Sequence, residues 1–447
     1  MTTRPTHDDP LIAASAELIG GPSGDLRTER PRWWSPLRVL IVLTGLGYAL
    51  GIWLDSSCRG TQWASPERYE HLCYTDIHPY FTIKGLADGV FPYLGQASPE
   101  QMIDAPVLVG LFMQVSAMLT SVIHGVWSHL DQAVLFTDVT TVLLFIPLVV
   151  AVVATSLAVR NRPWDAAMVA LAPMMVLAAT IGWDLLAVAL VALSYLALQR
   201  GHPVVSGILL GAALCAAHYP IAIMIAGLVL ALRTGRWRLT AQVLGAAVAT
   251  WLVVNLPFML LNLDGWSPIY RRLLDGGAEL GSAWYAITQM GGPSFAAPAL
   301  TALSVGTFLV LCLGIAVLVR RAPQAPRLAS VVFLVAAAFT LTAKGFAPQF
   351  GLWLIPLAVL ARPRWRDFLI WQACEVAYFA AVWWFLAGYQ IEGAKGLTPQ
   401  WYTVATLVHI AGTVYFAIMV SRDLLHPDLD PVRATTPVPE PSRTATS

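Results

Sequence analysis

Long apolar segments recur along this chain of 447 residues and constrain its fold more than any other feature. A helix needs about 20 apolar residues to cross a bilayer core, and fewer where Gly and Pro shorten the span. We therefore expect about twelve crossings, at 37–54, 134–158, 164–181, 183–199, 203–219, 220–233, 238–260, 298–319, 328–343, 350–361, 366–389 and 400–420. The composition agrees, because 57% of the residues are hydrophobic and only 12% are charged. These values exclude a soluble protein and predict an all-α polytopic membrane protein.

The charge balance and the two polar ends limit what the chain can contact. The formal net charge is +1, which excludes a basic surface for nucleic acid. Residues 1–35 lack the apolar core of a signal peptide, and residues 421–447 are rich in Pro, Ser and Thr. We predict that both are disordered cytosolic tails around one membrane domain at 36–420. Asp428 and Asp430 in the second tail are then interpreted as a solvated charge pair.

Arginines indicate the orientation of the chain in the membrane. With the spans above, one side receives Arg160, Arg162, Arg200, Arg233, Arg236, Arg238, Arg320, Arg321, Arg327, Arg362, Arg364, Arg366 and Arg422. The positive-inside rule makes this side cytosolic, with both termini, and we expect a plasma-membrane protein. The opposite side carries Lys84, Lys344, Lys395, Arg59, Arg68, Arg271 and Arg272. Cations placed against the rule often have a function there.

The apolar run at 105–127 is long enough to cross the membrane, but a crossing would move every later arginine cluster to the outside. We therefore expect a juxtamembrane helix that lies in the outer interface. The whole of 55–133 then forms one extracytoplasmic segment. A thirteenth span at 105–127 is the alternative.

Asp76 lies in this outer segment, ahead of a short amphipathic stretch. A carboxylate at the membrane surface can take a proton from an acceptor hydroxyl while that hydroxyl attacks a lipid-linked donor. An Asp before a helical stretch is also a common helix N-cap. The spacing alone leaves both interpretations open.

Several strings in the chain resemble those of a known family. They are YTDIHPYFTIKGLADGVFPY at 74–93, GWDLLAVAL at 182–190, GILLGAALCAAHYP at 207–220, GSAWYAI at 281–287 and AKGFAPQFGLWLIPL at 343–357. With the order of first span, large outer loop and many later spans, the chain resembles the C-type glycosyltransferases that use polyprenyl-phosphate sugars. Within that fold it resembles the actinobacterial α-mannosyltransferase branch, the relatives of the enzymes of phosphatidylinositol mannoside synthesis.

The resemblance implies an inverting transfer of a sugar, with mannose favoured, to a glycolipid, glycan or protein acceptor of the cell envelope. Asp76 would be the general base, and no metal or other cofactor is expected because cations of the protein can meet the charge of the leaving phosphate. Lys344 is the first candidate for that phosphate, although a Lys at a span end can also snorkel. Arg271 and Arg272 come next, with a solvated pair as the alternative. His218 is weaker, because the family more often carries Lys before Tyr-Pro.

Further residues are candidates for the sugar or the acceptor. Asp184 follows a predicted outer turn, where it would bind a hydroxyl or cap a helix. Gln349 can hydrogen-bond a pyranose, whereas for Trp284 an interface anchor is favoured over stacking. Tyr285 and His78 complete this set.

Cysteines and acids complete the predictions. Cys58 and Cys73 lie in the oxidising outer segment, where a disulfide would stiffen the loop that carries Asp76.

Other functions are compatible with the sequence. A membrane protein of this predicted architecture would also suit a decaprenyl-phosphate-arabinose-dependent arabinofuranosyltransferase. A lipid-linked sugar flippase is the alternative from another class, and it predicts functional charges near the membrane midplane. Asp138 and Glu375 are the acids that fall well inside predicted spans, and Asp138 lies near an outer end. A non-catalytic envelope scaffold would leave Asp76 dispensable.

Overall fold

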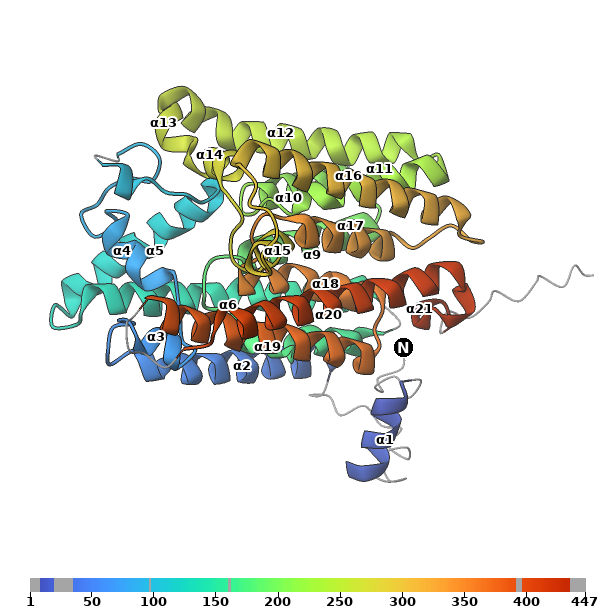
Figure 1. Cartoon of the computed structure of the whole chain (residues 1–447), viewed down its shortest axis with the longest axis horizontal. Helices are drawn as coiled ribbons and strands as arrows, with labels where there is room; N and C mark the ends of the chain where they lie inside the picture. Colours follow the sequence, from blue (N-terminus) through green and yellow to red (C-terminus); the bar gives the residue numbers. More distant parts are fainter. Residues whose placement is uncertain (1–8, 20–34, 96–97, 160–161, 391–395, 435–447) are drawn as a thin grey trace, which may run out of the picture.

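The computed structural model describes residues 9–19, 35–95, 98–159, 162–390 and 396–434. Within these ranges every regular element is a helix, and there is no strand. The long helices run side by side along the long axis of the molecule (Figure 1). This arrangement agrees with the all-α class expected from the apolar segments.

Seven helices are long and apolar enough to cross a membrane, judged by length and composition. They are α2 (Pro36–Asp55), α5 (Val107–Val126), α6 (Gln132–Ala158), α12 (Trp237–Leu261), α16 (Ala297–Arg321), α19 (Trp365–Gln390) and α20 (Pro399–Leu425). Five shorter apolar helices lie among them, namely α9 (Leu185–Gln199), α10 (Pro203–Leu214), α11 (Pro220–Thr234), α17 (Leu328–Thr342) and α18 (Gly351–Ala361). A polytopic membrane protein is thus supported, whereas the count of twelve crossings stays a prediction.

The expected span at 164–181 is not one continuous helix. It is divided into η4 (Pro163–Ala166), α7 (Ala167–Ala170) and α8 (Pro173–Ala178). Pro173 has no amide N–H and cannot continue the helix that ends before it. Because most side chains of this segment are buried by neighbouring helices, its broken backbone is kept away from lipid.

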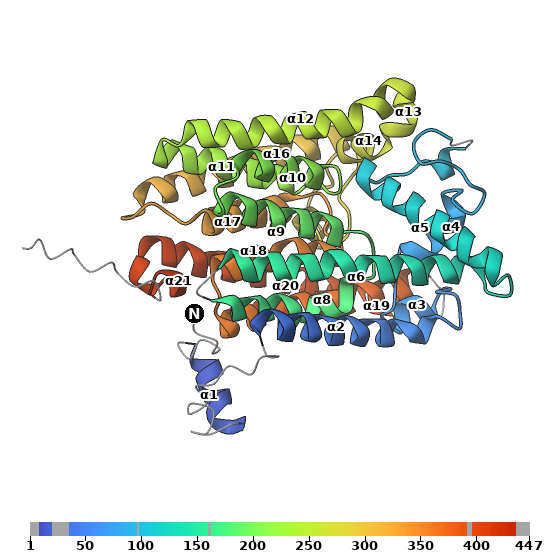
Figure 2. The ribbon, with the colours of Figure 1, turned by 180° about the vertical axis from the view of Figure 1, so that it is seen from behind.

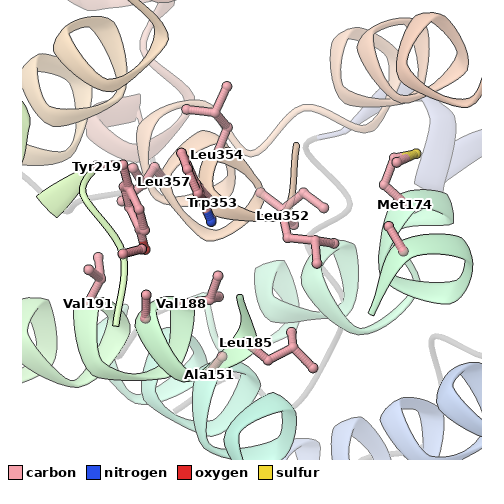
Figure 3. Packing of buried hydrophobic residues seen from close by; sticks show 14 of the residues in the cluster. Ala151, Met174, Leu185, Val188, Val191, Tyr219, Leu352, Trp353, Leu354 and Leu357 are labelled. Carbon is pink, nitrogen blue, oxygen red and sulfur yellow. The ribbon is translucent and has the colours of Figure 1, made fainter. Parts of the chain in front are cut away.

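The buried core of the bundle is built around α17 and α18, most of whose side chains are enclosed. Figure 3 shows residues of α18, such as Leu352 and Trp353, facing Leu185 and Val188 of α9. By contrast, α12 and α16 leave most of their apolar side chains exposed, as expected for helices that face lipid. The most enclosed helices are therefore α17 and α18.

Two ends of the bundle carry different structures. Figures 1 and 2 place α3 (Glu67–Glu70), α4 (Ile77–Ile83), α5, α13 (Leu263–Trp266) and α14 (Pro268–Asp275) at one end, and α21 (Pro431–Ala434) at the other. The axis of α5 is oblique to the long helices. This position suits a juxtamembrane helix, although α5 is also long and apolar enough to cross, and its placement relative to the bilayer stays a prediction.

The predicted disordered tail at 421–447 is wrong for its first fourteen residues. Helix α20 continues to Leu425, and η6 (Pro427–Leu429) and α21 follow. Asp423 is buried and forms an ion pair with Arg362, and Asp430 is buried and lies 2.7 Å from Arg327. Asp430 is therefore not a solvated charge, because its carboxylate is buried and its charge is met by Arg327. Residues 435–447 lie outside the described residues.

The first tail is also partly ordered. Helix α1 (Pro10–Ile19) is present, and the Asp9 carboxylate accepts hydrogen bonds from the backbone N–H of Leu11 at 2.9 Å and of Trp365 at 3.0 Å. This contact ties the start of α1 to the start of α19. The prediction of disorder over 1–35 is thus wrong for 9–19, and residues 1–8 and 20–34 lie outside the described ranges.

Candidate active site

Three of the predicted site residues converge on Gly182. A Cβ atom placed on Gly182 would lie 3.4 Å from Asp184 Oδ2, 4.0 Å from Asp76 Oδ2 and 4.0 Å from Gln349 Nε2. Asp76 precedes α4, Asp184 precedes α9, and Gln349 precedes α18. Each side chain keeps part of its surface exposed. The fold thus brings together three polar groups that are far apart in sequence and still open to a ligand.

Backbone contacts hold Asp76 in this place. Its N–H donates to the carbonyl oxygen of Ile181 at 2.8 Å, and Thr75 Oγ1 donates to the carbonyl oxygen of Thr180 at 2.8 Å. The outer segment is thereby fastened to the turn that carries Gly182 and Asp184.

The helix-cap interpretations of Asp76 and Asp184 are wrong. Both occupy N-cap positions, of α4 and α9, but among the described residues neither side chain accepts a hydrogen bond from its own helix. Both carboxylates face Gly182 instead. They are therefore available to a ligand.

The environment of Asp76 makes it a better base than an ordinary aspartate. Removal from water raises the pKa of Asp76 to about 6. The hydrogen bond that Tyr74 Oη donates to Oδ1, at 2.7 Å, lowers this pKa, the charge of Asp104 raises it, and the charges of Arg272 and Arg68 lower it. A carboxylate with a pKa near 6 is ionised at neutral pH and can accept a proton there.

An aromatic stack orients Asp184. Trp353 Nε1 donates to Asp184 Oδ1 at 2.8 Å. The Trp353 ring stacks on Phe350 with centroids 4.0 Å apart and on Tyr219 at 4.8 Å, and Figure 3 shows Trp353 beside Tyr219. With Oδ1 engaged by Trp353, the second oxygen of Asp184 is the one that faces Gly182.

Several buried polar atoms nearby have no protein partner within the described part of the chain, namely Trp183 Nε1, Tyr219 Oη and Gln349 Oε1. Buried polar groups are normally hydrogen-bonded. These atoms therefore suit a ligand rich in hydroxyl groups.

Two cations meet beside this cluster on Asp104. The Asp104 carboxylate accepts a hydrogen bond from Tyr80 Oη at 2.9 Å and from Arg272 Nη1 at 2.7 Å, and Lys84 Nζ lies 3.3 Å from it. Burial raises the pKa of Asp104, but Lys84, Tyr80 and Arg272 outweigh it and keep this pKa below its ordinary value. Tyr80 connects Asp104 and its two cations to the cluster around Gly182, because its ring lies 5.5 Å from that of Trp183, the residue after Gly182.

Lys84 was not among the predicted site residues. Its one sequence signal is that it lies on the predicted outer side, against the positive-inside rule. The ion pair with Asp104 places this lysine next to Arg272.

Lys344 does not have the role that the sequence predicted. Its Nζ donates to the carbonyl oxygens of Leu274 at 3.2 Å and Gly276 at 2.8 Å, and to Thr301 Oγ1 at 2.9 Å. An ammonium group has three donors, and these contacts use them all. These contacts tie Lys344 to the C-terminal end of α14 and to Thr301 of α16 (Ala297–Arg321).

The contacts of Arg271 and His218 are with residues other than the three at Gly182. Arg271 is exposed and pairs with Asp264 at 2.7 Å, which agrees with the surface-pair alternative. The His218 ring meets Tyr270 edge to face, with centroids 5.9 Å apart.

Three predicted sugar ligands take part in other contacts. Trp284 of α15 (Ala283–Gln289) donates its indole N–H to the carbonyl oxygen of Thr342 at 3.0 Å, as an anchor would. Tyr285 packs edge to face against Tyr402. The His78 ring lies 5.1 Å from that of Trp63, on the side of the outer disulfide. None of these contacts involves Asp76, Asp184 or Gln349.

Cys58 and Cys73 are joined by a disulfide, with their Cα atoms 6.2 Å apart. Trp63 packs on this bond. The disulfide connects the end of the first long helix to the segment that carries Asp76, as the sequence analysis expected.

An aromatic wall next to Asp76 was not predicted. The Tyr74 ring stacks on Trp383 of α19 with centroids 4.3 Å apart, and on Tyr69 at 5.7 Å. The guanidinium of Arg68 lies 4.7 Å from the Tyr69 ring. Trp383 falls inside an expected span, so its contact with the outer segment has no local sequence signal.

Comparison with known proteins does not assign the chain to a family. No family model matches the chain, and no curated protein matches it. Within the described residues there is also no group of three or more His, Cys, Asp or Glu side chains that could hold a metal ion.

Proposed function

We propose that this protein is a membrane glycosyltransferase that moves a sugar, with mannose favoured, from a polyprenyl-phosphate donor to a hydroxyl group of a cell-envelope glycolipid or glycan. The observation that carries the proposal is the convergence of Asp76, Asp184 and Gln349 on Gly182. Two carboxylates and an amide around one glycine suit a carbohydrate, because sugar hydroxyls both donate and accept hydrogen bonds.

In this proposal Asp76 is the general base. Its Oδ2 takes the proton of the acceptor hydroxyl as the oxygen forms a bond to the anomeric carbon. The bond from that carbon to the phosphate oxygen breaks, and its electron pair leaves with polyprenyl phosphate. The attack comes from the face opposite the leaving group, so the configuration inverts. Asp184 and Gln349 would hold hydroxyl groups of the transferred sugar.

Arg272 and Lys84 are the groups best placed to meet the charge of the phosphate. Both contact Asp104, and the charge of Arg272 acts on Asp76. Cations at the point where negative charge develops stabilise the transition state. This assignment replaces Lys344, whose donors are engaged by the C-terminal end of α14 and by Thr301 of α16.

We also propose that the site faces the outside of a plasma membrane, with cytosolic termini. Arg162 and Arg327 contact the C-terminal segment near α21, and Asp76 and Arg272 belong to the elements at the other end of the bundle. Positive charge gathers on the cytosolic side of membrane proteins. The donor's polyprenyl tail would then reach the site from the outer leaflet.

The test is transfer of label from polyprenyl-phosphomannose and polyprenyl-phosphoarabinose to an envelope extract, with purified wild type, Asp76→Asn and Asp88→Asn. Asp88 is an exposed acid of the same segment and serves as the matched control. We expect Asp76→Asn to lose about 10²–10⁴-fold in rate, the usual contribution of a general base, while it still binds the donor. The active donor names the sugar.

Two results would contradict the proposal. Equal transfer by wild type and Asp76→Asn would remove Asp76 as the base. Donor binding without transfer of either sugar would instead favour a lipid-linked sugar flippase, which is then tested by movement of the donor across a bilayer.

A further inference from the structure

A buried polar cluster lies between α19 and α20. Glu375 of α19 is 1% exposed, and His409 of α20 is 2% exposed. Glu375 Oε1 accepts hydrogen bonds from Trp371 Nε1 at 2.9 Å and Thr413 Oγ1 at 3.1 Å, and His409 Nδ1 lies 3.0 Å from the same oxygen. An ionisable group inside a membrane helix is costly, and such groups commonly mark function.

The second oxygen of Glu375 faces the start of α18. Oε2 is buried and has no hydrogen-bond partner in the described part of the chain. A Cβ atom on Gly351 would lie 3.6 Å from it. Gly351 is the first residue of α18, directly after the segment at 343–350, whose last three residues form the 3-10 helix η5 (Pro348–Phe350) that contains Gln349. This segment is called the loop at 343–350. The cluster therefore touches the end of that loop.

His409 holds the middle of the same loop. Its ring stacks on Phe346, with centroids 4.1 Å apart. Tyr378 Oη donates to the carbonyl oxygen of Phe346 at 2.7 Å, and the Tyr378 ring lies 4.9 Å from that of His409. Phe346 is thus held through both its ring and its backbone.

Packed rings continue from Phe346 to the candidate active site. The Phe346 and Phe350 rings lie 6.0 Å apart, edge to face, and Phe350 stacks on Trp353. Trp353 donates the hydrogen bond that orients Asp184. Gln349 lies between Phe346 and Phe350 in the chain. The contacts therefore lead from the buried cluster to two of the three groups at Gly182.

We propose that Glu375 and His409 are positioning residues, which hold the loop at 343–350 so that Gln349 and Asp184 face Asp76. This inference rests on the proposed function, because it assigns the cluster a part in sugar transfer. Its physical basis is preorganisation, since groups that bind the reacting sugar must already be in place when the sugar arrives. A loop without buried support would lose that geometry.

Variants of His409 separate the two contacts that it makes. His409→Asn keeps a polar group near the position of Nδ1 and removes the ring that stacks on Phe346. His409→Phe keeps a ring and removes the nitrogen. We expect His409→Asn to lower kcat about tenfold with little change in donor KM, and His409→Phe to restore most of the rate. Equal losses in both variants would contradict positioning through Phe346.

A double-mutant cycle distinguishes positioning from general stability. If His409 acts through Gln349, then adding Gln349→Ala to His409→Asn should lower the transfer rate little further than His409→Asn does alone. If the cluster only stabilises the fold, the two losses multiply. Multiplying losses would overturn the inference even where each single variant is less active.

Cysteine labelling tests the loop without using transfer. The rate at which a membrane-impermeant thiol reagent modifies Gln349→Cys is compared in the wild-type, Glu375→Gln and His409→Asn backgrounds. Glu100→Cys, at an exposed position of the outer segment, is the control. We expect a change of about tenfold at position 349 in the His409→Asn background, from local opening of the loop, and none at position 100.

The labelling outcome is independent of the proposed function. Unchanged labelling at position 349 in both backgrounds would overturn the inference, even if the wild type transfers sugar. Changed labelling in a protein that transfers no sugar would remove the proposed function and leave the dependence of the loop on the cluster in place.

Discussion

Tyr74 donates a hydrogen bond to Asp76 Oδ1 at 2.7 Å, two residues away in the same outer segment. The bond leaves Oδ2 facing Gly182, and it opposes the rise in the pKa of Asp76 that burial causes. Tyr74 is itself held by the ring of Trp383. A contact with a distant helix therefore helps to set the chemistry of this carboxylate.

The pH dependence of transfer follows from this relationship. Asp76 acts as a base only when ionised, so kcat/KM should fall as the pH drops below about 6. Tyr74→Phe removes a hydrogen bond that lowers the pKa, and the acidic limb should therefore move to higher pH. A pH profile of both proteins is the measurement, with Tyr415→Phe, whose hydroxyl donates to Asp367 at 2.9 Å, as the control. A limb that stays in place would show that another group governs it.

Donor affinity should depend on Arg272 and not on its neighbour. Both side chains are exposed, but Arg272 pairs with the partly buried Asp104 and with Glu279, whereas Arg271 pairs with the exposed Asp264. Arg272→Gln is expected to raise the donor KM about tenfold, the effect of one charge-assisted hydrogen bond. Arg271→Gln should leave it unchanged. The comparison is made by initial rates at varied donor concentration, and equal effects would argue against a phosphate at Arg272.

Adding a methyl group at Gly182 should lower the transfer rate more than it lowers the stability of the fold. A Cβ at this position meets Asp184 Oδ2 at 3.4 Å, an ordinary contact, so Gly182→Ala is expected to fold. The methyl group would occupy the point on which the three polar groups converge and lower transfer about tenfold or more. Gly60→Ala, with no described atom within 4 Å of its Cβ, is the control. Full activity of Gly182→Ala would place the sugar elsewhere.

The C-terminal segment should contribute to stability. Asp423 is a buried partner of Arg362, so Asp423→Asn leaves that arginine with less compensation. A broken buried pair costs about 3 kcal/mol, which thermal unfolding in detergent would detect as a clear fall in Tm. Asp428→Asn, an exposed acid in the same segment, should unfold like the wild type. A wild-type Tm for Asp423→Asn would show that the pair adds nothing.

The class of fold was predictable from the sequence, because apolar helices of membrane length follow from local composition alone. Asp76 was also predictable as a candidate, because the local sequence around it resembles that of a known family. The disulfide between Cys58 and Cys73 was predictable because both cysteines fall in the segment that was expected to lie outside the membrane. Periodicity did not show the break before Pro173. A proline inside an apolar run is tolerated or disruptive according to its neighbours.

Tertiary structure decided which groups meet. Residues 76, 184 and 349 carry no local signal that they share one point, and Lys84 gained its place only through Asp104 and Arg272. Lys344 was the first candidate for the phosphate by sequence, but the C-terminal end of α14 and Thr301 of α16 take its three donors. Likewise, the sequence suggested a solvated carboxylate at Asp430, but in the folded protein this carboxylate is paired with Arg327. The reason is physical: apolar length is a local property of the chain, whereas a buried charge takes its role from its partner, and only the packed fold determines that partner.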